Sequence, residues 1–131
     1  MRTCVLYFSR TGNTKFMAEA IANAIKAPAF DLATSDLTVV EDYDMIILGT
    51  PVEGARPAPE TAAFVDRLST TDAKKAILFC TYKLFKGNTF KTLSGALSGK
   101  GYNSVLEVSK RAVKIGTTDF SDSIEKIKKA L

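Results

Sequence analysis

The stretch Ser9-Arg10-Thr11-Gly12-Asn13-Thr14 decides the fold, because it joins an apolar run to a segment with helical periodicity. The apolar run, Val5-Leu6-Tyr7-Phe8, predicts a buried strand. Where a strand turns into a helix, free backbone N–H groups and the helix macrodipole attract an anion. The stretch also carries three hydroxyl side chains, and Gly12 lacks the Cβ that would block a phosphate. It therefore predicts a phosphate-binding loop; an ordinary N-cap at Asn13 or Thr14 is the alternative.

The composition is that of an ordinary globular protein of one domain, residues 1–131, with 46% hydrophobic and 24% charged residues. The net charge is +4 and the sequence pI is about 9.1. No apolar run approaches the roughly 20 residues that span a membrane, and the N-terminus shows no secretory signal pattern. We therefore expect a cytoplasmic protein that does not enter a membrane.

The sequence contains no histidine, which excludes histidine-based acid–base catalysis, Ser-His and Cys-His nucleophile pairs, and histidine-ligated metal. The two cysteines, Cys4 and Cys80, each lie in an apolar run, so we expect core residues rather than a disulfide. A partly exposed Cys80 thiol is the alternative, because this residue comes late in its run. We expect no catalytic side chain and no metal site, so that any chemistry belongs to a bound cofactor.

Apolar runs separated by helical patterns predict five strands that alternate with helices. The predicted strands span residues 3–8, 29–32, 45–49, 76–80 and 105–113, the last with a bend near 109–111. The predicted helices follow the opening loop and span 59–68, 89–97 and 120–131, while 33–43 has no clear period and could hold a helical turn. This alternation predicts a doubly wound α/β fold, a three-layer sandwich around a parallel sheet.

Three loops rich in special residues leave the carboxyl ends of predicted strands: residues 9–14, 50–59 and 81–88. Ligands of such sheets bind beyond these strand ends, where the strand order reverses. The loop at 50–59 contains three prolines and one glycine, which predicts a rigid shape. We expect the three loops to converge on one site.

With these loops the sequence resembles the flavodoxin family, because the first loop matches the phosphate-binding pattern Ser/Thr-x-Thr-Gly-x-Thr at all four fixed positions. The resemblance covers essentially the whole chain, which is at the short end for that family. It implies a five-stranded parallel sheet in the order 2-1-3-4-5. It also implies FMN as the cofactor and electron transfer between redox partner proteins as the function.

The resemblance implies three groups of cofactor-binding residues. The FMN phosphate would be held by backbone N–H groups and by Ser9, Thr11, Asn13 and Thr14, with Arg10 and Gly12 in the same loop. One face of the ring would be covered by a first flavin loop that contains Thr50, Pro51, Val52, Glu53, Gly54 and Ala55. The other face would be covered by a second flavin loop that contains Thr81, Tyr82, Lys83 and Gly87.

Two of these residues have alternative interpretations. In flavodoxins a peptide of the first flavin loop turns its carbonyl toward flavin N5, and Gly54 would allow that turn. Alternatively, Gly54 only completes a turn after Pro51. Tyr82 would stack on the ring, or it is an aromatic residue at the rim that contacts no ligand.

The chain departs from the family pattern at Glu53, where many relatives have a Trp or Met that packs on the flavin. Because a carboxylate stacks poorly, we expect Glu53 to point to solvent and to leave one ring face open to a substrate or hydride donor.

The positive charge is the second departure, because flavodoxins are generally acidic. Lys83, Lys86, Lys91 and Arg56 lie in or beside the flavin loops. These cations would favour an anionic reduced flavin and steer acidic partners, such as a ferredoxin-like donor or a reductase, or they form an ordinary solvated surface.

Other binding motifs are poor fits. The run 95–101 has the wrong spacing for a nucleotide P-loop, and no G-x-G-x-x-G follows a strand. Aromatic residues are not interleaved with the basic ones, so nucleic-acid binding is not expected. The leading interpretation is an FMN-binding electron carrier. The alternatives are an FMN-dependent reductase of a small quinone-like acceptor and a flavodoxin fold without flavin that acts as a binding module; the sequence indicates no oligomeric state.

Overall fold

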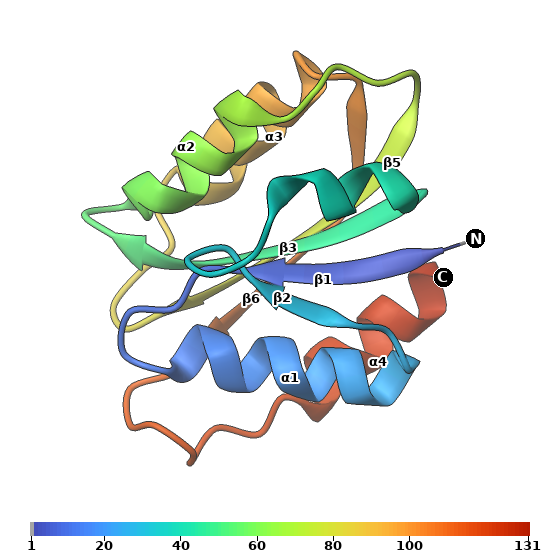
Figure 1. Cartoon of the computed structure of the whole chain (residues 1–131). Coiled ribbons are helices and arrows are strands. Elements are labelled where there is room, and N and C mark those ends of the chain that lie inside the picture. Colours follow the sequence, from blue (N-terminus) through green and yellow to red (C-terminus); the bar gives the residue numbers. More distant parts are fainter. Residues whose placement is uncertain (1) are drawn as a thin grey trace.

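The computed structural model describes residues 2–131, and for Leu37 the backbone alone. Its centre is a sheet in which five parallel strands run in the order β2-β1-β3-β5-β6 (Figure 1). These strands are β1 (Thr3–Tyr7), β2 (Ala29–Asp31), β3 (Met45–Glu53), β5 (Lys74–Tyr82) and β6 (Tyr102–Arg111). With the parallel strands numbered along the chain, the order is 2-1-3-4-5, which confirms the predicted topology.

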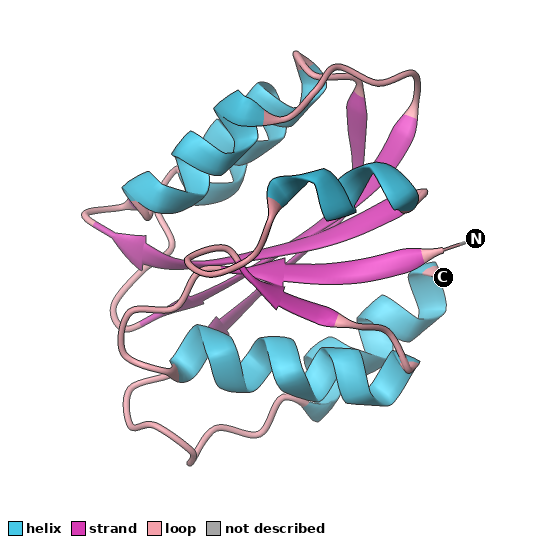
Figure 2. Ribbon diagram, in the orientation of Figure 1, coloured by secondary structure: helices cyan, strands magenta, loops and turns pink. Residues whose placement is uncertain are grey.

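Helices cover both faces of the sheet, so the molecule has three layers (Figures 1 and 2). One face carries α1 (Asn13–Ile25) and α4 (Ser121–Ala130). The other carries α2 (Pro59–Arg67), α3 (Thr89–Ser98) and the 3₁₀ helix η1 (Leu37–Asp42), which lies in the segment the sequence could not place. Within residues 2–131 no helix is long and apolar enough to span a bilayer.

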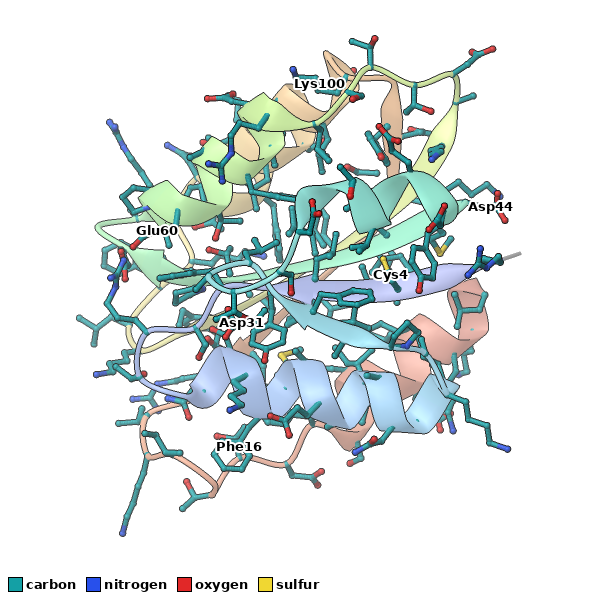
Figure 3. All side chains as sticks on the ribbon, in the orientation of Figure 1. Cys4, Phe16, Asp31, Asp44, Glu60 and Lys100 are labelled. Atoms are coloured by element: carbon teal, nitrogen blue, oxygen red, sulfur yellow. The ribbon has the colours of Figure 1, made fainter. Side chains whose placement is uncertain are left out.

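Alternating side chains of the strands divide the core into two clusters. Cys4 and Leu6 of β1 pack with Phe64 of α2, whereas Val5 and Tyr7 pack on the α1 side. This alternation is expected for a strand that is buried on both faces. Figure 3 shows the result, with Cys4 inside the molecule and Phe16 on the outer side of α1.

Both cysteines are free and fully buried, which confirms that they are core residues. Burial raises the pKa of each thiol to about 12. The alternative of a partly exposed Cys80 is wrong, because β5 continues two residues past it to Tyr82.

The predicted loop at 50–59 is partly sheet, which corrects the expected end of the strand at Gly49. β3 runs on to Glu53, and the chain returns through the two-residue strand β4 (Arg56–Pro57), which pairs antiparallel with β3. Between them Gly54 and Ala55 have φ of 59° and 65°, positive at both positions as a two-residue hairpin turn of type I′ requires. The prolines concealed this hairpin, because proline is rare inside strands and typical of loops.

The last strand also differs from expectation. β6 runs without a break to Arg111, so the predicted bend near 109–111 is absent. The irregularity lies earlier, where Ser104 pairs with Ala76 and Leu106 with Ile77. Val105 is therefore an extra residue, as in a β-bulge.

Candidate functional site

A cavity of about 410 Å³ lies where the strands β1, β3 and β5 end. It is lined by Arg10, Thr11 and Asn13 of the first loop, by residues 51–55 of the β3–β4 hairpin, by residues 81–85 and by Ala112. The volume is within the roughly 300–1,000 Å³ that small-molecule sites occupy. The structure thus brings the three predicted loops to one place.

Some predicted site residues lie outside the cavity lining, namely Ser9, Gly12, Thr14, Thr50 and Gly87. Conversely, the sequence reasoning did not select Leu84, Phe85 or Ala112. Leu84 and Phe85 had a signal, since they are two adjacent apolar residues in an otherwise polar loop. No sequence signal marked Ala112. It lies at the cavity only because it directly follows β6, which ends there.

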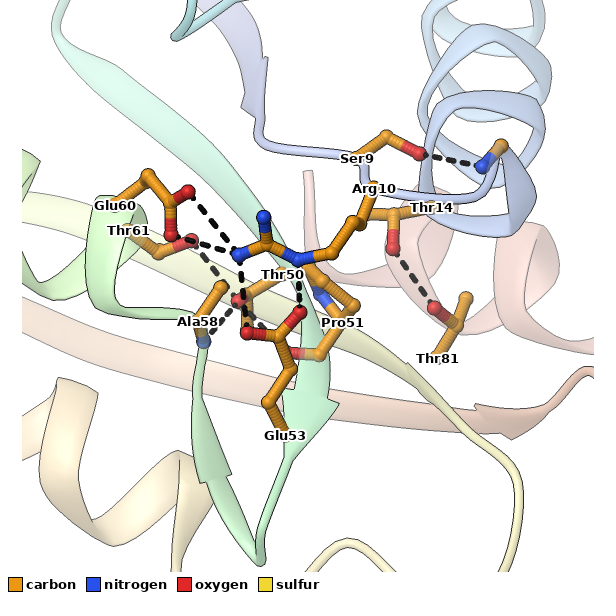
Figure 4. A network of polar contacts seen from close by, with 11 residues as sticks. Ser9, Arg10, Thr14, Thr50, Pro51, Glu53, Ala58, Glu60, Thr61 and Thr81 are labelled. Atoms are coloured by element: carbon orange, nitrogen blue, oxygen red, sulfur yellow. Dashed lines mark hydrogen bonds and ion pairs between the residues drawn. The ribbon is translucent and has the colours of Figure 1, made fainter.

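The first turn of α1 presents unpaired backbone donors. The Ser9 hydroxyl oxygen accepts from the N–H groups of Gly12 and Lys15, both at 3.1 Å. Figure 4 shows Ser9 bonded to a nitrogen at the start of α1. Within the described chain, the N–H groups of Thr11, Asn13 and Thr14 make no hydrogen bond. Free N–H groups at the start of a 13-residue helix fit an anion such as a phosphate.

Two side chains predicted to hold a phosphate are instead bonded within the protein. The hydroxyls of Thr14 and Thr81 lie 2.8 Å apart, and the Asn13 amide donates to the carbonyl of Ala112 at 3.1 Å. Asn13, Thr14 and Thr81 are buried. These contacts tie the first loop to the ends of β5 and β6.

Thr50 fixes the base of the hairpin. It is fully buried, and its hydroxyl donates to the carbonyl of Pro51 and accepts from the Ala58 N–H and the Thr61 hydroxyl (Figure 4). This one side chain therefore joins β3 to the start of α2. It positions the cavity wall without reaching the cavity.

The side chain of Arg10 crosses from the first loop to the hairpin. Its Nε and Nη2 donate to the two oxygens of Glu53 at 2.5 and 3.0 Å, and Nη2 also donates to Glu60 at 2.9 Å (Figure 4). The guanidinium carbon lies 4.9 Å from the centre of the Phe8 ring. The hydrogen bonds to Glu53 and Glu60 raise the pKa of Arg10, and the bond from Arg10 lowers the pKa of Glu60. The expectation that Glu53 points to solvent is wrong, because Arg10 holds its carboxylate.

The tip of the hairpin rests on the loop that follows β5. The Asn88 N–H donates to the Ala55 carbonyl at 2.9 Å. Gly87 has φ of 56°, and a Cβ there would come within 2.4 Å of the Ala55 Cβ, so only glycine fits. Earlier in this loop, the Lys83 carbonyl accepts a bond from Arg111 Nε at 2.8 Å, and Leu84 and Phe85 are 82% and 60% exposed.

Residues 4–96 match the family model of the flavodoxin domain. The chain belongs to the flavodoxin family. It is 32% identical over 105 residues to a flavodoxin of Clostridium beijerinckii, a match that covers 74% of this chain and 76% of the relative. An uncharacterised protein of Methanocaldococcus jannaschii is 29% identical over 105 residues, covering 78% of this chain and 69% of that protein.

Solved structures show the same fold. A flavodoxin from the domain Archaea superposes with a TM-score of 0.76 at 20% identity, over 98% of this chain and 92% of that one. Flavodoxins are FMN-binding electron carriers that transfer electrons to redox partner proteins. The cavity of this chain fits FMN in two respects: unpaired N–H groups lie at the start of α1, and Tyr82 lies in the lining.

Proposed function

We propose that this protein binds FMN in the cavity at the strand ends and carries electrons in the cytoplasm between redox partners that are acidic. The observation that carries this proposal is the convergence of the three loops around one cavity beside the unpaired N–H groups of α1. Residues 1–131 would act as one domain in this role.

The chain's own residues would hold the cofactor at its two ends. The N–H groups of Thr11, Asn13 and Thr14 would bind the phosphate, and the exposed Thr11 hydroxyl could add a donor. Tyr82 would lie against the ring, and Gly54, at a φ of 59° in the hairpin turn, would be the residue whose peptide turns toward the flavin. When bound, FMN supplies one- and two-electron transfer, so the protein needs no catalytic side chain.

Acidic partners are supported by the cations at the cavity rim. Lys83 lines the cavity, and Lys86 of the same loop, Arg56 of β4 and Lys91 in the first turn of α3 are exposed. In the described part of the chain these residues form no ion pair with a carboxylate. An uncompensated positive rim accelerates association with an acidic surface, and salt weakens that effect.

A reductase of a small quinone-like acceptor is the second candidate. The exposed side chains of Leu84 and Phe85 line the cavity and offer apolar contact to a flat acceptor. The earlier reason for this candidate, an open ring face beside a solvent-directed Glu53, no longer supports it, because Arg10 holds that carboxylate.

The visible absorption spectrum of the purified protein, with added FMN and after desalting, tests the proposal. Retained flavin bands are expected. A carrier should then be reduced by NAD(P)H only through a reductase, whereas direct multiple turnover with a quinone would identify the reductase. A colourless protein that does not bind added FMN would overturn both the carrier and the reductase. A flavodoxin fold that acts as a binding module would then be the remaining interpretation.

A further inference from the structure

The aromatic residues that line the cavity all come from one side. They are Tyr82 and Phe85, both in the loop after β5, among the described lining residues. The hairpin side contributes residues 51–55, which include neither an aromatic residue nor a methionine. A flat ring in this cavity would therefore find no aromatic partner on the hairpin side.

The flat group on the hairpin side is the ion pair between Arg10 and Glu53. Nε donates to Oε2 and Nη2 donates to Oε1 (Figure 4). This is the two-bond pattern by which a planar guanidinium holds a carboxylate. Both residues line the cavity, and their side chains are 48% and 31% exposed. The pair therefore presents a planar surface of its own to the cavity.

This surface is held in place from two directions. Glu60, in the first turn of α2, accepts a further bond from Nη2 at 2.9 Å. The buried ring of Phe8 lies on the guanidinium, 4.9 Å from its carbon atom. The guanidinium is thus contacted by Phe8, directly after β1, by Glu53 of the hairpin and by Glu60 of α2. A side chain that is ordered before the ligand arrives loses little entropy on binding.

We propose that the Arg10–Glu53 ion pair is the wall on which one face of the flavin ring lies, in place of an aromatic side chain. Guanidinium groups stack on aromatic faces, and Glu53 balances the charge that Arg10 would otherwise place against the ring. This inference rests on the proposed function, since it assumes that a flavin occupies the cavity. It assigns a cofactor-binding role to a residue pair whose members lie 43 positions apart in the chain.

The test compares the affinities of FMN and of riboflavin, which lacks the phosphate, by quenching of flavin fluorescence. Arg10→Gln and Glu53→Gln each remove the ion pair and keep a polar side chain. We expect each variant to bind both flavins about 10-fold more weakly, and the double variant to lose no more than the worse single variant. Arg67→Gln, an exposed site in the last turn of α2, makes the same charge change and should bind both flavins as the wild type does.

The outcomes separate this inference from the proposed function. Wild-type affinity for both flavins in Arg10→Gln and Glu53→Gln would overturn the inference and leave the proposed function standing. A loss for FMN alone would show that Arg10 serves the phosphate, which also overturns it. A wild-type protein that binds neither flavin would overturn the proposed function itself. Circular dichroism and the thermal midpoint of each variant confirm that it is folded.

Discussion

The hydroxyl groups of Thr14 and Thr81 lie 2.8 Å apart in the protein interior, and they join the first turn of α1 to the end of β5. Both residues belong to loops that the sequence assigns to the cofactor. In this structure they bind each other, so their first contribution is to hold two walls of the cavity at a fixed spacing.

Replacing one member of this pair should cost more than replacing both. Thr14→Val or Thr81→Val leaves a buried hydroxyl without a partner, which should lower the free energy of unfolding by about 1–3 kcal/mol. In the double variant two apolar side chains of the same shape meet, so much of that loss should be recovered. Urea unfolding of the four proteins measures the coupling; strict additivity would contradict the bond.

The hydroxyl of Thr50 should matter more than its methyl group. Thr50→Val removes the acceptor of the Ala58 N–H and the Thr61 hydroxyl, and we expect a loss of about 1–3 kcal/mol in unfolding free energy. Thr50→Ser keeps the hydroxyl and is the matched control. Chemical denaturation compares them, and equal stabilities of the two variants would show that packing, not hydrogen bonding, governs this position.

The contact between Gly87 and Ala55 can be separated from backbone strain. Gly87→Ala and Gly116→Ala both put a side chain at positive φ, which costs about 1–2 kcal/mol. A Cβ at position 116 meets nothing within 4 Å, whereas one at position 87 overlaps the hairpin tip. Thermal unfolding should therefore show a clearly larger loss for Gly87→Ala. Similar losses would mean that the hairpin moves aside easily.

The Arg10–Glu60 contact should stabilise the protein only above the acid range. Because the pKa of Glu60 is lower in the folded state than in the unfolded state, its stabilising effect is complete above the ordinary value of about 4.5 and is lost as the pH falls through the folded value. Arg10 stays charged throughout. Urea midpoints of the wild type and Glu60→Gln should differ at pH 7 and converge as the pH falls through the folded pKa of Glu60.

A carboxylate outside any ion pair of the described chain, Glu125 on α4, provides the control for this experiment. The Glu125→Gln variant should not reproduce the convergence. If it did, a general effect of net charge would explain the result, and the specific contact with Arg10 would not.

The thiols of Cys4 and Cys80 should be unreactive in the folded protein. Burial raises the pKa of Cys4 and Cys80 to about 12, and only the thiolate reacts. At pH 8 a disulfide reagent should therefore modify neither residue until the protein unfolds. The measurement is the absorbance of the coloured thiol that the reagent releases, in buffer and in 6 M guanidinium. Rapid release in buffer would contradict the buried placement of both cysteines.

The sequence predicted the elements whose information is local. The run at 5–8 and the stretch at 9–14 placed β1 and the start of α1, because apolar periodicity and turn chemistry act between neighbours in the chain. The same reasoning located the three loops that line the cavity, since parallel strands deliver their exit loops to one edge of a sheet. The hairpin at 52–57 was missed where local signals conflicted, because its prolines favour a loop.

What the sequence determined by itself is therefore the doubly wound fold, the strand–loop–helix turn at residues 9–14 and the edge of the sheet where a ligand would bind. Only the tertiary structure decided which side chains face that ligand. Arg10 donates hydrogen bonds to Glu53 and Glu60, which lie 43 and 50 positions further along the chain. Thr14 is hydrogen-bonded to Thr81, which lies 67 positions further along. Such partners are set by strand order and by the direction of each side chain after the layers have packed. No pattern of neighbouring residues encodes those two quantities, and for that reason Glu53 was expected in solvent and is found bound to Arg10.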